Sequence, residues 1–277
     1  CLLSNLPNIR FDLPSTVKNT PNTIPGACPI CQEWFMALYC LSKDFQKFEF
    51  TAELVTELPS TDWIKTSLSK PPGILILKGT APNDDDLTGL VYDSLDVFLE
   101  IWECQGFLPP KRCPEQGVAE KAFLNLYGVG ILTCSLSLKK TTCISLNTLN
   151  KYLEEKQTKF LLGDHLSYAD CTLIPKLHHL KIAAEAYKGF TIPLDYIYVW
   201  RYLKNAYKTS AFDESQPFDE DIVFMYQHKA SCPAKFNPQC LRYIMAIGTR
   251  YAGQHYVILY WDYDMYCISH YRFSSSN

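Results

Sequence analysis

Two cysteines separated by two residues carry the clearest chemical signal in this sequence. Cys28 and Cys31 enclose a Pro-Ile dipeptide, and an apolar stretch with helical spacing follows them as far as Leu41. An alternating strand pattern precedes them at Asn8–Leu13. Cys28 would then lie at a helix start, where unpaired backbone N–H groups and the helix dipole stabilise a thiolate. The order of strand, loop, Cys-x-x-Cys and helix is typical of a thioredoxin-type redox site.

Two other interpretations of the cysteine pair stay open. Half of a zinc site would need a second pair of ligands at suitable spacing, and the sequence shows none, so we expect no metal. In the second interpretation, the two thiols are inert side chains on a helix of the core. If the site is active, Cys28 and Cys31 are its catalytic residues. Cys28 should be the more reactive, because Cys31 lies one turn inside the helix.

A proline pair supplies a second candidate feature. Pro71 and Pro72 stand directly before Ile74–Leu77, which is apolar throughout and predicts a fully buried strand. An X-Pro bond at such a place can be cis, and thioredoxin-type sites use that proline to present backbone groups to a peptide-like substrate. We therefore assign cofactor binding to Cys28 and Pro72, with a plain turn as the alternative.

Composition narrows the class of protein. The chain has 277 residues, of which 47% are hydrophobic, so one large or two small domains with a sizeable core are expected. A net charge of −3 with scattered basic residues argues against nucleic acid as a partner. The 12 cysteines lack the regular spacing of a secreted scaffold and indicate reduced thiols in a cytosolic protein. The sequence contains no uninterrupted run of about 18 apolar residues, so it predicts no ordinary transmembrane helix.

The pattern of elements predicts two domains. Residues 1–106 contain strand patterns at 48–54, 74–77 and 87–90, with helix patterns between and after them, which together predict a thioredoxin-like α/β domain. The stretch 107–114 is rich in proline and charged residues, which predicts a linker. Residues 115–229 have helical patterns and predict an all-helical domain. A Tyr-rich tail, 230–277, has no structure that we can assign from its sequence.

A helix-start signal stands in the second domain. Ser167 followed three residues later by Asp170 is a pattern of the capping-box type, to which we assign structure and no catalysis. The helix that it opens carries His178 and His179, which we interpret as helix-face residues.

A thioredoxin-like domain followed by an all-helical domain is the architecture of glutathione transferases. Several blocks narrow the resemblance: Cys28–Gln32, Lys70–Pro72, Phe160–Asp170, Pro175–His178, Tyr187–Pro193 and Tyr202–Tyr207. Together they resemble the chloride intracellular channel family, in particular its shorter, invertebrate-type members. The resemblance runs from about Ile9 to His228.

That resemblance implies a protein that is cytoplasmic and membrane-associated. It implies a soluble monomer that associates with or inserts into membranes, where an oligomer supports chloride conductance. Membrane lipids, chloride and other proteins would then be its partners. The resemblance also implies glutaredoxin-like chemistry at Cys28. A glutathione-dependent thiol oxidoreductase and a non-catalytic scaffold with this fold are therefore the alternative functions.

Glutathione binding is expected to be weak or absent. The resembled family has Thr-Asp where the substrate-binding helix starts, and the corresponding place here reads Leu90-Val91. Cys28 and Pro72 would hold the cysteinyl part of glutathione, but the charged γ-glutamyl end would stay unpaired. An unpaired polar group costs on the order of 1–3 kcal/mol.

The segment Ile24–Ser42 is the candidate for membrane insertion, because about 20 residues span a bilayer as a helix. Pro25, Pro29 and Glu33 oppose insertion, and a charge at the bilayer centre costs roughly 2.5–3.5 kcal/mol. Insertion therefore needs a trigger that loosens the first domain and neutralises Glu33. We expect membrane association to rise as the pH falls towards about 5, in the ordinary carboxylate range.

Overall fold

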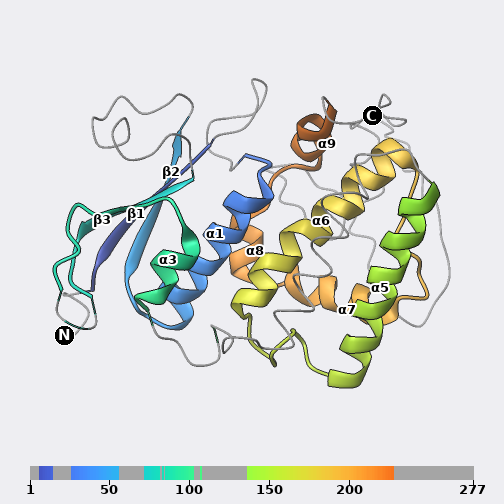
Figure 1. Ribbon diagram of the computed structural model, residues 1–277, viewed down its shortest axis with the longest axis horizontal. Helices are drawn as coiled ribbons and strands as arrows, with labels where there is room; N and C mark the ends of the chain where they lie inside the picture. Colours follow the sequence, from blue (N-terminus) through green and yellow to red (C-terminus); the bar gives the residue numbers. More distant parts are fainter. Residues whose placement is uncertain are drawn as a thin grey trace, which may run out of the picture.

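The computed structural model describes residues 6–14, 26–55, 72–81, 83, 85–102, 107 and 136–227 (Figure 1). They form a sheet-containing first part and a helical second part, which is the fold class expected from the sequence. Most of the linker 107–114 and the tail 230–277 lie outside the described residues. The domain boundaries therefore stay predictions.

A four-stranded mixed sheet builds the first part. Its strands are β1 (Asn8–Pro14), β2 (Glu49–Val55), β3 (Gly73–Lys78) and β4 (Val91–Tyr92), in the order β2-β1-β3-β4. Strand β1 pairs parallel with β2 and antiparallel with β3, while β3 pairs antiparallel with β4. Ile9 and Phe11 are fully buried and alternate with Asn8 and Arg10, as the period of a half-buried strand requires.

The last strand does not lie where the sequence pattern placed it. A strand was expected at Leu87–Leu90, but Thr88 and Gly89 form a turn there and β4 is Val91–Tyr92. Gly89 has φ +82°, in the left-handed region that glycine reaches without a steric penalty. Its N–H still donates to the Ile76 carbonyl at 2.8 Å. The turn therefore touches the sheet and delays regular pairing by a few residues.

Helix α1 (Pro29–Tyr39) lies between the sheet and the helices of the second part (Figure 1). It continues into the π-helical turn η2 (Cys40–Asp44) and is buried on nearly all sides, which explains why its sequence is apolar apart from Gln32 and Glu33. Helix α3 (Leu95–Glu100) follows β4 and is capped by Ser94, whose hydroxyl accepts the Val97 N–H at 3.5 Å.

Helix α6 is the central element of the second part. The helices described there are α5 (Leu136–Lys156), α6 (Tyr168–Lys188), α7 (Ile197–Ala206), α8 (Ser210–Ser215) and α9 (Asp219–Gln227). Helix α6 packs against α1, α7 and α9, and it ends at Gly189 in the left-handed conformation with φ +60°.

Asp170 holds the start of α6 and is fully buried. Its carboxylate accepts bonds from the Ser167 N–H at 2.9 Å, the Ser167 hydroxyl at 2.5 Å, the Leu161 N–H at 2.9 Å and the Tyr202 hydroxyl at 2.8 Å. Burial raises the pKa of Asp170, while these four bonds act in the opposite direction. The expected capping box is confirmed, and its carboxylate also ties the preceding loop and α7 to α6.

Candidate functional site at the domain interface

Cys28 stands at the start of α1, as the sequence predicted. It is the N-cap residue, Pro29 is the first helical residue, and the Cys28 carbonyl accepts the Gln32 N–H at 3.0 Å. The Cys28 side chain is half-buried, whereas Cys31 is 1% exposed. Cys28 is therefore the member of the pair that a molecule from solution can reach.

The two thiols of the motif interact directly. A hydrogen bond to Cys28, followed by burial, raises the pKa of the Cys31 thiol far above its usual range. Cys31 therefore keeps its proton and donates it towards the Cys28 sulfur. This arrangement suits Cys28 as the nucleophile, and the catalytic role of Cys28 and Cys31 stays a prediction.

Pro72 precedes β3 directly and is half-buried. The residue before it lies outside the described residues, so the assignment of Pro72 to cofactor binding also stays a prediction.

The start of α3 differs from the expectation. Because β4 lies at Val91–Tyr92, the residues directly before the helix are Asp93 and Ser94, and the assignment of Leu90-Val91 to this position is wrong. Asp93 is exposed and offers a carboxylate, while Ser94 caps the helix. The sequence argument against holding a charged γ-glutamyl group therefore no longer applies.

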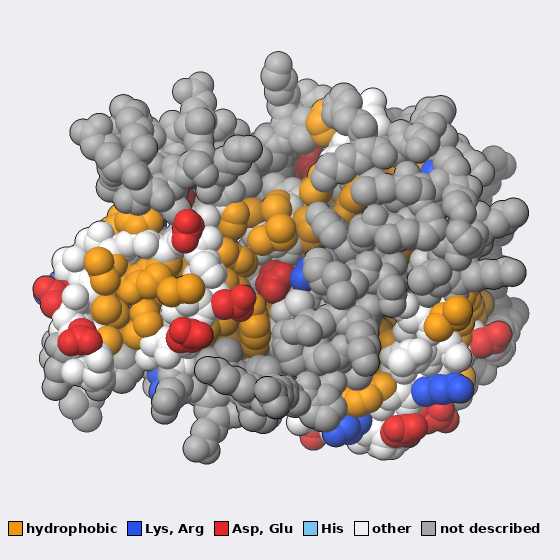
Figure 2. All heavy atoms as spheres, in the orientation of Figure 1, with side chains coloured by type: hydrophobic (Ala, Val, Ile, Leu, Met, Phe, Trp, Pro, Cys, Tyr) orange, Lys and Arg blue, Asp and Glu red, His pale blue; other side chains and the backbone are white. Residues whose placement is uncertain are grey.

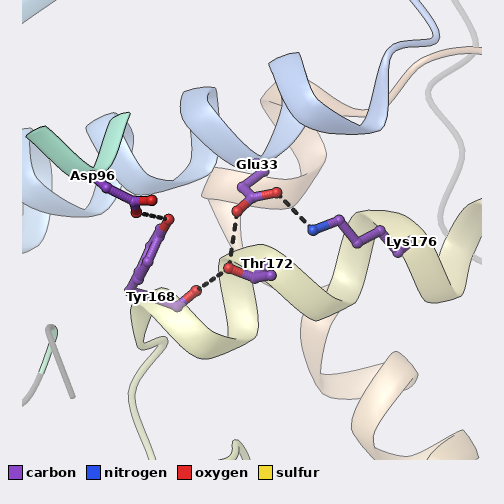
Figure 3. Close-up of polar contacts among 5 residues, drawn as sticks. All are labelled: Glu33, Asp96, Tyr168, Thr172 and Lys176. Carbon is purple, nitrogen blue, oxygen red and sulfur yellow. Dashed lines mark hydrogen bonds and ion pairs between the residues drawn. The ribbon is translucent and has the colours of Figure 1, made fainter. Parts of the chain in front are cut away.

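A buried ion pair joins the two parts of the chain. Lys176 on α6 and Glu33 on α1 lie 2.8 Å apart between Nζ and Oε2, and both side chains are largely buried (Figure 3). The Thr172 hydroxyl contacts Glu33 Oε1 at 2.9 Å. Breaking one half of such a pair is costly, because the remaining charge stays buried without a partner.

The contacts extend along α6 to α3. The Thr172 hydroxyl also contacts the Tyr168 carbonyl at 3.1 Å, and the Tyr168 hydroxyl donates to Asp96 Oδ1 on α3 at 2.7 Å (Figure 3). Burial raises the pKa of Tyr168, and the negative charge of Glu33 adds to this effect. Five side chains thus connect α3 and α1 through one face of α6.

Helix α8 holds α1 from a second direction. Gln32 Nε2 donates to the Ser215 hydroxyl at 3.4 Å, and the Tyr39 hydroxyl donates to Glu214 Oε1 at 3.2 Å. The helix that starts at Cys28 is therefore held by side chains of α6 and α8. Sequence reasoning noticed Glu33 but missed its partner. The position of Lys176 between the apolar residues Pro175 and Leu177 was the signal in the sequence that could have indicated a buried partner.

Some hydrophobic surface stays exposed on the first part. Figure 2 shows hydrophobic side chains gathered over the sheet-containing part, with acidic side chains around them. The large exposed hydrophobic residues described there are Ile30, Leu77, Leu90 and Val97. Within the residues that the structure describes, no helix is long and apolar enough to cross a membrane.

Two adjacent histidines lie on the interior of α6. His178 Nδ1 lies 3.0 Å from the Tyr207 hydroxyl, and His179 Nδ1 lies 3.4 Å from the Tyr226 hydroxyl. Burial lowers the pKa of both, and that of His179 falls to about 3. The fold therefore holds both imidazoles neutral.

His179→Gln should reduce the acid sensitivity of the fold. The folded pKa of His179, about 3, lies below the ordinary value, so the unfolded chain binds the proton first. The contribution of the neutral His179 to the free energy of unfolding is fully present above about pH 6.5 and is lost as the pH falls towards 3. At pH 5 the loss is about 2 kcal/mol. Urea unfolding at pH 7 and pH 5 should show an acid loss that is about 2 kcal/mol smaller in the variant than in the parent, since the buried His178 contributes its own loss to both.

The exposed His165 provides the control, since His165→Gln should leave the acid loss unchanged. Asp219 and Asp221 on α9 act in the opposite direction, because burial raises the pKa of each to about 6. The quantity to compare is therefore the difference between variant and parent. An acid loss in His179→Gln equal to that of the parent would contradict the assignment.

The chain is similar to known proteins in sequence and in fold. Residues 145–205 match the family model described as glutathione S-transferase, C-terminal domain. The chloride intracellular channel exc-4 of Caenorhabditis elegans is 38% identical over 87 residues, which are 31% of this chain and 30% of that protein. The chain thus spans less than a third of exc-4 in this match.

Two longer matches cover most of the chain. The chloride intracellular channel Clic of Drosophila melanogaster is 28% identical over 218 residues, which are 76% of this chain and 78% of that protein. The chloride intracellular channel exl-1 of C. elegans is 29% identical over 232 residues, which are 82% of this chain and 91% of that protein.

Solved structures agree on the fold. The crystal structure of the C. elegans homologue EXC-4 has a TM-score of 0.64 at 22% identity, covering 87% of this chain and 97% of that one. A dehydroascorbate reductase of Chlamydomonas reinhardtii has a TM-score of 0.59 at 21% identity, covering 80% and 98%. The sheet, the capped central helix and these neighbours show a glutathione-transferase-like fold, and in sequence the chain is similar to chloride intracellular channels of invertebrates.

Proposed function

We propose that this chain associates with membranes and supports chloride conductance there. The observation that carries the proposal is the similarity to two proteins named chloride intracellular channels over 76% and 82% of the chain. The proposal includes a cytoplasmic monomer, an oligomer in the membrane, and lipids, chloride and other proteins as partners.

In the structure α1 is packed between the sheet and α6, which we call the closed arrangement (Figure 1). Membrane association requires a change from this arrangement. Glu33 of α1 is paired there with Lys176, and the α1 side chains from Cys31 to Leu38 are buried and not available to lipid. Protonation of Glu33 removes the ion pair and the charge that insertion would have to carry into the bilayer. Acid is therefore the proposed trigger, and separation of α1 from α6 is the proposed first step.

Chloride efflux from vesicles tests this proposal. Vesicles of mixed neutral and anionic lipid loaded with chloride should release it increasingly as the pH falls from 7 to about 5, together with binding of the protein. Vesicles loaded with gluconate serve as the control for unspecific leakage. Efflux no greater than that of protein-free vesicles at every pH would contradict the proposal.

A second candidate function is thiol–disulfide exchange at Cys28. It is favoured by the half-buried position of Cys28 at the helix start and by the hydrogen bond that keeps the proton on Cys31. We propose glutathione as its co-substrate, with Asp93 as a carboxylate available to the amino group of the γ-glutamyl part. Calorimetry of glutathione binding to the parent and to Asp93→Ala tests this assignment.

Alkylation should modify Cys28 first. Brief treatment of the native protein with iodoacetamide at pH 7, followed by peptide mapping, should label Cys28 more than about tenfold faster than Cys31 or Cys40. Both of these are buried. Cys143, which is half-buried on α5 and away from a helix start, is the internal control. Faster labelling of Cys31 or Cys40 would contradict the helix-start argument.

A further inference from the structure

Two exposed apolar side chains lie on neighbouring elements at the edge of the sheet. Leu90, directly before β4, is 46% exposed, and Val97 on α3 is 53% exposed. The two elements are packed together, because the Tyr92 ring of β4 meets the Phe98 ring of α3 with centroids 5.5 Å apart. Apolar area left in water next to polar residues can mark a binding surface. Neither the conductance nor the thiol exchange proposed above uses these two side chains.

The charged side chains of this stretch are all acidic. Residues 79–102 contain six Asp or Glu and no Lys, Arg or His. Five of the six belong to the described residues, and all five are exposed (Figure 2). Asp96 and Glu100 stand one helical turn apart on the outer face of α3, beside Val97. We call the exposed side chains of Asp86, Leu90, Asp96, Val97 and Glu100 the α3 surface.

The chain beyond α9 contains a segment of the opposite charge. Residues 229–255 contain four Lys or Arg and no Asp or Glu. Two of these cations, Arg242 and Arg250, enclose an apolar stretch from Tyr243 to Ile247. Such a segment offers apolar side chains to Leu90 and Val97 and cations to the neighbouring carboxylates.

The connection from α9 is long enough to reach the α3 surface. The hydroxyl of Tyr226, near the end of α9, lies 3.4 Å from His179 Nδ1. His179 stands 11 residues beyond Tyr168 on α6, which is about 17 Å along the helix. The Tyr168 hydroxyl in turn donates to Asp96 at 2.7 Å. The 14 residues 228–241 can span up to about 46 Å, which exceeds this path with the contacting side chains included.

We propose that residues 242–251 of this chain dock on the α3 surface of the same molecule. Arg242 and Arg250 lie beside its carboxylates, and the apolar side chains between them cover Leu90 and Val97. A contact within one molecule needs little affinity of its own, because a short connection keeps the effective concentration of the segment high. The proposal does not depend on chloride conductance or on thiol exchange.

Photo-crosslinking of the full chain tests the proposal. With Val97 replaced by the photoreactive p-benzoylphenylalanine, irradiation of dilute protein and digestion should give position 97 linked to a peptide from 242–251, within the monomer. The yield should fall several-fold between about 0.05 M and 0.5 M salt, because salt screens the charges. The same replacement at Ile144 on α5, which is 65% exposed, is the matched control and should give no such link.

Charge variants test the pairing. Arg242→Glu/Arg250→Glu should lower the yield from position 97 several-fold, and adding Glu100→Lys should restore part of it. Arg272→Glu, outside the segment, should leave the yield unchanged. Absence of links from position 97 to 242–251, or equal yields from positions 97 and 144, would overturn the proposal. So would links found only between two molecules, with a yield that rises with protein concentration, because a second copy would then be the occupant.

Discussion

Lys176→Met should lower the free energy of unfolding by about 3–5 kcal/mol. The substitution keeps most of the side-chain volume but removes the only cation that the described residues place in contact with the buried Glu33 carboxylate. The Thr172 hydroxyl alone cannot replace that charge. Denaturant unfolding at pH 7 measures the effect.

The double variant Glu33→Gln/Lys176→Met is the decisive comparison. It removes both charges, so it should regain most of the stability that either single change loses. Lys43→Met, at an exposed position of η2, should change the stability by less than about 0.5 kcal/mol. Equal stability of Lys176→Met and the parent would show that the pair does not hold the interface.

Asp170→Ala should be about as damaging, with a loss of about 3–5 kcal/mol. The substitution leaves four donors without their acceptor: two backbone N–H groups and the hydroxyls of Ser167 and Tyr202. The start of α6, the preceding loop and α7 would lose their common anchor. Thermal or denaturant unfolding measures the loss.

Graded variants separate this network from an ordinary surface effect. Ser167→Ala removes one of the four donors and should cost only about 0.5–2 kcal/mol. Asp195→Ala, at an exposed loop position, should be nearly neutral. If Asp170→Ala costs no more than Ser167→Ala, the carboxylate does not have the central role that the geometry assigns to it.

Local patterns in the sequence predicted much of this molecule. The spacing of apolar residues and the cysteine pair located α1 and placed Cys28 at its start. Ser167 and Asp170 predicted the start of α6 correctly, because a capping box depends on residues three positions apart. Features that depend on a few neighbouring residues can be recognised without a structure.

Features that depend on distant residues could not be predicted in this way. Glu33 and Lys176 are separated by more than half of the chain, and nothing local indicates their pairing. The error at Leu90-Val91 was local, because the turn at Thr88-Gly89 displaces β4 and hence the start of α3. Asp93-Ser94 before an apolar residue was the capping signal that could have corrected it.

We expect α1 to leave α6 when the protein meets a membrane. Trp34 on α1 is 7% exposed in the closed arrangement and reports on this step. In a chain that retains only this tryptophan, brominated lipids should quench its fluorescence at pH 5 and not at pH 7. In Glu33→Gln the quenching should begin nearer to neutral pH. If Trp34 stays shielded from the lipid at every pH, or Glu33→Gln binds vesicles no better than the parent at pH 7, α1 is not the segment that enters the membrane.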